Sequence, residues 1–226
     1  MIIKINGLEN ELILNDSQIG VIEINDTKLY RHILDIINKS IEGISNNEIF
    51  ILNDKQEEIT FKDNVYLLND IFNIDINSKK IINKIYNLIN SSYDDEERLL
   101  FSNKIQEVRN ELIYKTNEFP FTFSVNNDIS VLDMLKAFNF KVDYSTYSTL
   151  LEKIELLIDV MTNLNIAKIL IIPNLKMYLT SEELIYLYKY SLYNNIILIT
   201  IEKYCENSIE YEKRLLIDKE YNDYIM

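Results

Sequence analysis

The sequence predicts an α/β protein with a mostly parallel sheet and an inserted helical subdomain. Short runs rich in Ile and Leu alternate with amphipathic helical periods near both ends of the chain. The middle of the chain instead carries two long helical periods with no strand between them. We therefore expect a discontinuous α/β head domain at residues 1–75 and 143–226 and an α-helical leg domain at residues 76–142.

Five apolar runs are expected to form the sheet: residues 20–24, 49–52, 65–68, 168–172 and 196–201. Runs of this kind are typical of parallel strands, which are buried on both faces. The polar residues 25–27 cap a helical period that continues to Ile41, and Thr180 with Glu183 forms the capping-box pattern of a helix over residues 180–193. Both ends of the chain therefore predict a strand–helix–strand unit.

The middle of the chain predicts a helical hairpin. Ser78 is expected to cap a helix whose apolar residues run from Ile81 to Ile89. The acidic residues 94–97 suit the positive end of a second helix. The apolar stripe of this second helix comprises Phe101, Ile105, Val108 and Leu112. A further helix over residues 148–163 is expected to return the chain to the sheet.

Composition excludes several classes of protein. The chain has 226 residues, of which 47% are hydrophobic and 26% charged, so a disordered tail protein is excluded. Its longest apolar runs are far shorter than the roughly 20 residues of a membrane span, and its N-terminal residues lack the pattern of a secretion signal. We expect a cytoplasmic protein without a membrane partner. One cysteine, Cys205, and one histidine, His32, exclude both an internal disulfide and the usual zinc cage.

No catalytic residue is expected. A phosphate loop needs glycines between strand and helix, but residues 23–29 contain none. The strand ending at Ile172 is followed by Pro173 and Asn174 instead of the acid that would hold magnesium. His32 is interpreted as a surface residue and Cys205 as a structural one.

Charge is unevenly distributed along the chain. The net charge is −13, which by itself argues against a nucleic-acid partner. From Lys79 to Lys115, however, there are seven basic and six acidic residues, whereas the rest of the chain holds 16 basic and 30 acidic residues. A basic surface on an acidic body is therefore compatible with this sequence.

Four segments of the chain resemble a known family. Residues 66–78, 128–136, 167–202 and 215–219 are similar in sequence and order to the small CRISPR-associated adaptation protein of type II-A systems. The third segment includes the turn Tyr178-Leu179-Thr180-Ser181-Glu182-Glu183. With the matching chain length, the resemblance spans nearly the whole chain.

The resemblance implies a fold and a role. It implies a nucleotide-binding α/β fold that lacks the phosphate loop, and a homotetrameric ring that encircles double-stranded DNA and threads on from free ends. It further implies bound calcium and a non-enzymatic part in spacer acquisition. The implied partners are the CRISPR integrase proteins and the RNA-guided effector nuclease.

Candidate site residues follow from local basicity and from the family's calcium binding. The DNA-contacting candidates are Lys28, Arg31, Lys39, Lys79, Lys80 and Lys84. The candidate calcium ligands are Glu118, Asp128 and Asp133. Residues 117–123 are mostly apolar, and residues 126–128 offer one acid and two amides, so we expect weaker calcium binding or fewer ions than in the family.

Two other functions are open at this stage. The protein could be an acidic scaffold that holds the integrase complex and the nuclease together, or a degenerate relative of nucleotide-binding proteins. A set of tyrosines could stack on bases, although helical spacing beside Leu184 and Leu187 favours packing in the core or between subunits. These tyrosines are Tyr178, Tyr186, Tyr190 and Tyr193.

Overall fold

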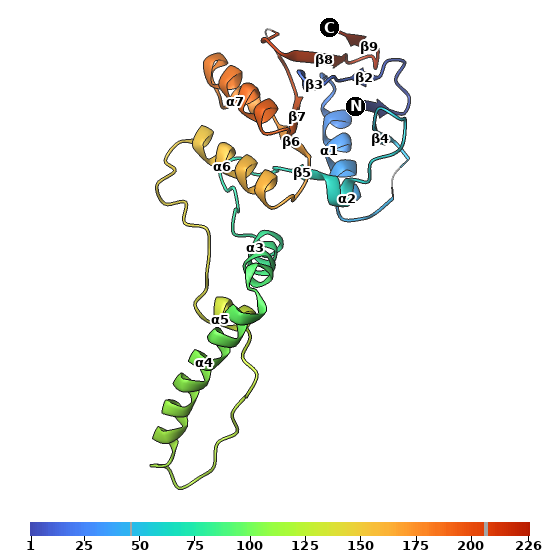
Figure 1. Ribbon diagram of the computed structural model, residues 1–226. Coiled ribbons are helices and arrows are strands. Elements are labelled where there is room, and N and C mark those ends of the chain that lie inside the picture. Colours follow the sequence, from blue (N-terminus) through green and yellow to red (C-terminus); the bar gives the residue numbers. More distant parts are fainter. Residues whose placement is uncertain (46, 206–207) are drawn as a thin grey trace. The chain divides into compact units, whose positions relative to one another are not determined.

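The chain divides into two compact units. The computed structural model describes residues 1–45, 47–205 and 208–226 (Figure 1). The head domain comprises Met1–Asp75 and Tyr144–Met226, and the leg domain comprises Ile76–Asp143. The second junction lies one residue from the expected position.

A six-stranded sheet forms the centre of the head domain, in the order β5-β6-β7-β3-β8-β9. Its strands are β3 (Ile19–Ile24), β5 (Val65–Leu67), β6 (Ile169–Pro173), β7 (Ile197–Glu202), β8 (Glu212–Ile217) and β9 (Asp223–Ile225). All neighbouring strands pair in parallel except β8 and β9. The prediction of a mostly parallel sheet is thus confirmed, although β8 and β9 were not predicted.

The predicted strand–helix–strand unit near the N-terminus is wrong. β4 (Ile49–Leu52) does not join the large sheet but pairs antiparallel with β1 (Ile2–Ile5). β1 also pairs with β2 (Leu12–Ile13), which gives a separate three-stranded sheet. Burial alternates along β4, whereas every residue of β3 is buried. Alternation is typical of an antiparallel strand with one face on the core.

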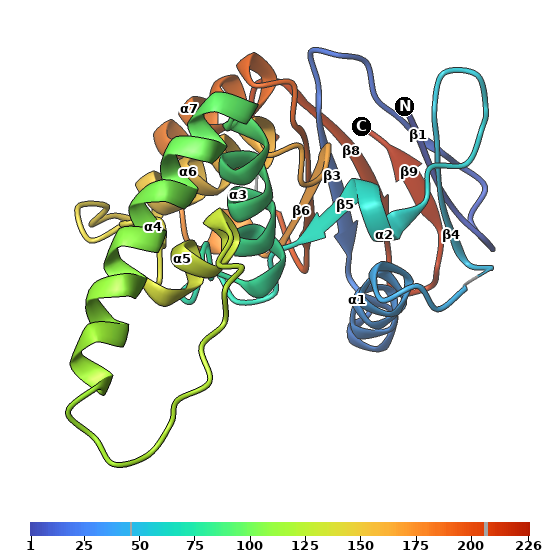
Figure 2. The same ribbon diagram turned by 60° about the horizontal axis from the view of Figure 1, so that its bottom comes forward.

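Helices cover both faces of the large sheet (Figure 2). α1 (Thr27–Ile41) and the small sheet lie on one face, while α6 (Leu150–Asn163) and α7 (Ser181–Tyr193) lie on the other. Ile33, Ile36 and Ile37 of α1 are buried in a cluster with residues of both sheets. A short helix, α2 (Phe61–Asn64), and a 3₁₀ turn, η1 (Leu175–Met177), complete the domain. The strand–helix–strand unit β6–α7–β7 is parallel, as predicted.

Side chains cap the helices of the head domain where the sequence indicates. Asp26 Oδ1 accepts a hydrogen bond from the Leu29 N–H at 2.8 Å and begins α1. Thr180 and Glu183 form the predicted capping box of α7. These bonds pair backbone N–H groups that a helix leaves without a partner in its first turn.

The leg domain is not the predicted hairpin. It contains α3 (Lys79–Ser92), α4 (Asp95–Thr116) and α5 (Val131–Ala137). Its small core forms between α3 and α5, where Tyr86 is buried with Val131 and Leu135. The Tyr86 hydroxyl donates to the Phe140 carbonyl at 3.0 Å. The leg domain therefore has its core on α3 and α5 and not along α4.

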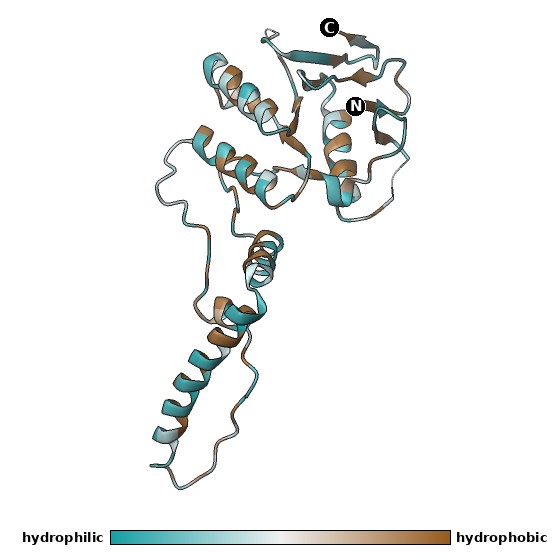
Figure 3. Cartoon of the chain, viewed as in Figure 1, coloured by the Kyte–Doolittle hydropathy of each residue, from teal (hydrophilic) through white to brown (hydrophobic). Residues whose placement is uncertain are grey.

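The predicted apolar stripe of α4 reaches a core only at its first position, Phe101. Among the described residues, none in α4 is buried, and Val108 and Leu112 are 56% and 64% exposed. Phe101, at the start of the stripe, is partly buried against the core of α3 and α5, with its ring edge-on to Tyr93. In Figure 3 the helix is mostly hydrophilic with scattered apolar positions. The acidic residues 94–97 lie at the start of the helix as predicted, and Asp94 and Glu97 also form a capping box.

Two further interpretations can be compared with the structure. Tyr186 and Tyr193 are 53% and 85% exposed, so they do not pack in the core of the chain. Packing between subunits and stacking on bases stay predictions for these two tyrosines. The buried tyrosine of α7 is Tyr188. No helix in the described part of the chain is long and apolar enough to cross a membrane.

Candidate nucleic-acid interface

The first basic group lies on α1. Lys28, Arg31 and Lys39 are exposed, and their spacing places them on one side of the helix. Lys39 Nζ lies 2.6 Å from Asp35 Oδ2, and this hydrogen bond raises the pKa of Lys39. Lys28 and Arg31 form no ion pair with any described residue. The face is therefore most positive in its first two turns.

His32 lies on the same helix as these cations. Its Nε2 atom is 2.7 Å from Glu48 Oε2, and both side chains are about half exposed. This placement agrees with the interpretation of His32 as a surface residue.

The second basic group lies on α3, which carries three lysines and no acidic residue. Lys79 and Lys80 are exposed, and Lys84 is half-buried. Lys79 and Lys80 occupy the first two positions of the helix, where the helix dipole disfavours a cation by about 0.3–1 kcal/mol. The Ser78 side chain makes no capping bond there. Helix stability therefore does not account for these lysines.

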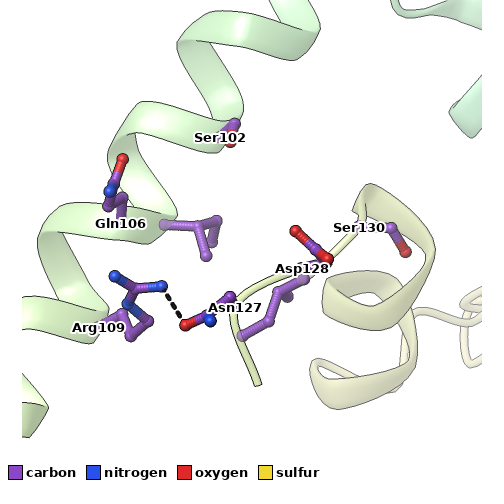
Figure 4. A pocket seen from close by; sticks show the side chains of 8 residues that line it. Ser102, Gln106, Arg109, Asn127, Asp128 and Ser130 are labelled. Atoms are coloured by element: carbon purple, nitrogen blue, oxygen red, sulfur yellow. Dashed lines mark hydrogen bonds between the residues drawn. The ribbon is translucent and has the colours of Figure 1, made fainter. Parts of the chain in front are cut away.

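The leg domain contains a pocket of about 470 Å³ between α4 and the segment before α5 (Figure 4). It is lined by Ser102, Ile105, Gln106, Arg109, Asn127, Asp128, Ile129 and Ser130. Arg109 Nη1 donates to Asn127 Oδ1 at 2.7 Å, the bond drawn in Figure 4. Asp128 is the one acidic residue of this lining.

The three candidate calcium ligands do not form a shared site in this structure. Within residues 1–45, 47–205 and 208–226, no group of three His, Cys, Asp or Glu side chains is arranged to hold a metal. Asp128 shares its pocket with the Arg109 guanidinium, which opposes a cation. Asp133 Oδ2 instead accepts hydrogen bonds from the Ser130 N–H and hydroxyl, which lower the pKa of Asp133. Glu118 is exposed and does not line the pocket.

Calcium prefers six to eight oxygen ligands, several of them carboxylates. The residues described above therefore do not fit a calcium site. The expectation of weak calcium binding stays a prediction.

A buried polar network lies at the carboxyl ends of the parallel strands, and the sequence did not predict it. Glu202 ends β7 and pairs in register with Glu23 of the neighbouring β3. Glu23 forms a buried ion pair with Arg214 of β8, whose guanidinium also donates to the Cys205 carbonyl at 3.1 Å. Buried charges must be paired in this way because desolvation is costly.

A second buried ion pair continues the network. Lys176 Nζ and Glu212 lie 2.8 Å apart, and the Tyr188 hydroxyl also donates to Glu212 at 2.8 Å. Burial raises the pKa of Tyr188 and raises that of the Cys205 thiol to about 12. Cys205 is thus an unreactive thiol, as the sequence indicates.

Backbone N–H groups in the turn between β3 and α1 already have hydrogen-bond partners within the protein. The Asn25 N–H donates to the Ile217 carbonyl at 2.9 Å, and the Leu29 N–H donates to the Asp26 carboxylate. A phosphate loop needs such amides to point at the phosphate. No acidic residue follows Ile172 at the end of β6, but Glu202 ends the neighbouring strand β7. Its side chain is buried and accepts a hydrogen bond from the Lys176 N–H at 3.2 Å. These N–H groups and the Glu202 carboxylate are therefore bonded to other groups of the protein, whereas binding a nucleotide would require them to be free.

Replacing Glu202 by Gln is expected to raise the free energy of unfolding by about 3 kcal/mol at about pH 8 and to leave it unchanged near pH 4. Burial raises the pKa of Glu202 from 4.5 to about 7. Between these values the unfolded chain releases the proton first, so the stability of the wild type falls as the pH rises through this window. Gln has no proton to release. Urea unfolding across this range measures the effect, and parallel pH profiles of the two proteins would contradict it.

Comparisons with known proteins agree with this architecture. A search of curated proteins found no match. Among solved structures, the crystal structure of Stu0660 of Streptococcus thermophilus is similar with a TM-score of 0.60 and 13% sequence identity. The match covers 100% of this chain and 76% of that one, and it shows a shared fold.

The sequence model of one family matches residues 42–221, which is most of the chain. The matched range includes the whole leg domain and β4 to β8 of the head domain. The chain therefore belongs to the family described as CRISPR-associated protein (Cas_Csn2).

Proposed function

We propose that this CRISPR-associated protein binds double-stranded DNA through the basic faces of α1 and α3 and does so without regard to sequence. The observation that carries the proposal is α3, which bears three lysines and no acid in a chain of net charge −13. Clustered lysines attract phosphates by releasing counterions from the duplex. The acidic remainder of the surface repels DNA, so binding is confined to the basic faces.

The proposed assembly is a homotetrameric ring that closes around the duplex and loads over free ends. The support is family membership together with an uneven charge distribution, since a ring accommodates an acidic exterior and a basic inner face. Contacts to phosphates alone position a protein on DNA but carry no sequence information. Such a ring tracks DNA ends irrespective of their sequence.

The proposed role is non-enzymatic support of spacer acquisition in type II-A CRISPR immunity. The partners in this role are the integrase proteins and the RNA-guided effector nuclease. Four of the acidic groups described above support this role, because they are engaged in a helix cap or a buried ion pair and are not free to hold a nuclease metal: Asp94, Glu97, Glu23 and Glu212. Any calcium bound by the protein is proposed to bind weakly.

The test compares a linear duplex with a covalently closed circle of identical sequence, at two salt concentrations and with or without calcium. We expect preference for the linear form, weakened by salt and little changed by calcium. Equal binding to both forms would replace the ring by an open surface groove.

The same experiment separates this function from the alternatives. Absence of binding to either DNA would favour an acidic scaffold for the integrase and nuclease. A parallel titration with ATP addresses a degenerate nucleotide-binding protein, and we expect no saturable binding, because the amides at the β3–α1 turn are engaged.

A further inference from the structure

The turn between β3 and α1 presents carbonyl oxygens at a partly buried position. Lys203, which directly follows β7, donates its ammonium to the carbonyl of Asn25 and, at 3.4 Å, to the carbonyl of Ile24. β7 and β3 are neighbours in the sheet, so the lysine joins the ends of two adjacent strands. The ammonium thus lies at the position where a nucleotide-binding fold places phosphate.

Both ends of Lys203 are fixed. Its backbone N–H donates to Asn174 Oδ1 at 3.2 Å, and Asn174 in turn donates its own N–H to the Ile201 carbonyl at 2.9 Å. The Asn25 amide nitrogen, in the orientation that satisfies its neighbours, donates to the Lys203 carbonyl and to Glu23 Oε1, both at 3.2 Å. Asn25 and Lys203 therefore hold each other through reciprocal bonds.

The polarity of this site is the reverse of that of a phosphate cradle. Carbonyl oxygens carry partial negative charge and face the ammonium, and the Asp26 carboxylate adds a full negative charge nearby. The Leu29 N–H is the main cause that lowers the pKa of Asp26, and Lys203 contributes to the same shift. Such surroundings attract a cation and repel phosphate.

We propose that the carboxyl end of β3 is a binding site for a primary ammonium group, filled by Lys203 of the same chain. A primary ammonium group has three N–H donors and no acceptor, so it suits a site lined by carbonyl oxygens. Lys203 is thereby a positioning residue that fixes the start of α1. Lys28 and Arg31 lie in the first turns of this helix, so their placement depends on the filled site.

The test is chemical rescue of Lys203→Ala. We expect this variant to melt roughly 4–8 °C below the wild type, because a hydrogen-bonded charge is lost in a chain of this size. Propylammonium, which replaces the removed atoms, is expected to restore about half of the loss or more at tens of millimolar. Tetramethylammonium has the same charge but no N–H donor and is expected to restore nothing. Lys219→Ala, at an exposed lysine, is the matched control and is expected to show neither the loss nor the rescue.

Two results overturn the proposal: an unchanged melting temperature of Lys203→Ala, or a loss that propylammonium and tetramethylammonium affect equally. A second measurement uses the wild type and does not depend on the folding of that variant. A hydrogen-bonded ammonium exchanges its protons slowly and gives an amine signal in nitrogen-15 NMR. We expect one such signal for Lys203, distinct from that of the buried Lys176, that disappears in Lys203→Arg and persists in Lys219→Ala. Absence of any signal that Lys203→Arg removes overturns the proposal.

Discussion

Replacing Lys79, Lys80 and Lys84 together by Glu is expected to lower the affinity for a DNA duplex by about a hundredfold or more at moderate salt. The change converts the cationic face of α3 into an anionic one. For the wild type, the logarithm of the affinity is expected to fall linearly with the logarithm of the salt concentration, and each lost phosphate contact should lower that slope by about 0.9. Affinity measured at several salt concentrations therefore reports both the loss and the number of contacts.

The helix itself is expected to tolerate these changes. Glu at the first two positions of α3 interacts favourably with the helix dipole, so the double variant Lys79→Glu/Lys80→Glu should be as stable as the wild type or slightly more stable. A matched control places the same change in charge elsewhere on the leg domain, at the exposed Lys104, Lys115 and Lys136. Equal loss of affinity in the control, or unchanged affinity in the α3 variant, would contradict the assignment.

Replacing Arg214 by Met is expected to lower the free energy of unfolding by about 3–5 kcal/mol. Arg214 is 8% exposed and Glu23 is 2% exposed, so the substitution leaves a carboxylate buried without its partner. Urea unfolding measures the loss.

The double variant Glu23→Gln/Arg214→Met separates the cost of losing the Arg214 side chain from the cost of leaving the Glu23 carboxylate buried without its partner. It removes the orphaned charge and keeps an oxygen that accepts from Asn25, so it should recover most of the stability. If the losses of the two single variants simply add in the double variant, the residues do not act as a buried pair.

The strands that could be predicted are those that are buried on both faces and therefore consist almost entirely of apolar residues. β6 and β7 are almost entirely apolar, and both were expected within one residue of their bounds. β8 begins Glu-Lys-Arg and offers only three apolar residues, so it carries no such signal. β4 was expected as a strand, but four residues do not specify which strand they pair with. Pairing depends on distant segments that local periodicity does not report.

The same distinction applies to the candidate sites. The apolar period of α1 fixes which side is buried, so exposure of Lys28 and Arg31 on the other side could be predicted. The buried pair of Glu23 and Arg214 joins residues 191 positions apart, and no local pattern indicates it. The calcium candidates stay a prediction, and the local pattern did not indicate that the Asp133 carboxylate accepts from Ser130 in a capping box.

The lack of buried side chains along α4 has a consequence for its folding. A helix of 22 residues that has no buried side chain, and in which Phe101 alone of the predicted stripe packs against the leg-domain core, depends mainly on its own backbone bonds and on its capping box. Helix–coil theory makes such a segment marginal in isolation, with fraying that begins at both ends. Its amide protons should therefore exchange with deuterium well before those of β3 and β7, and α4 constitutes a separate, weakly cooperative unit of unfolding.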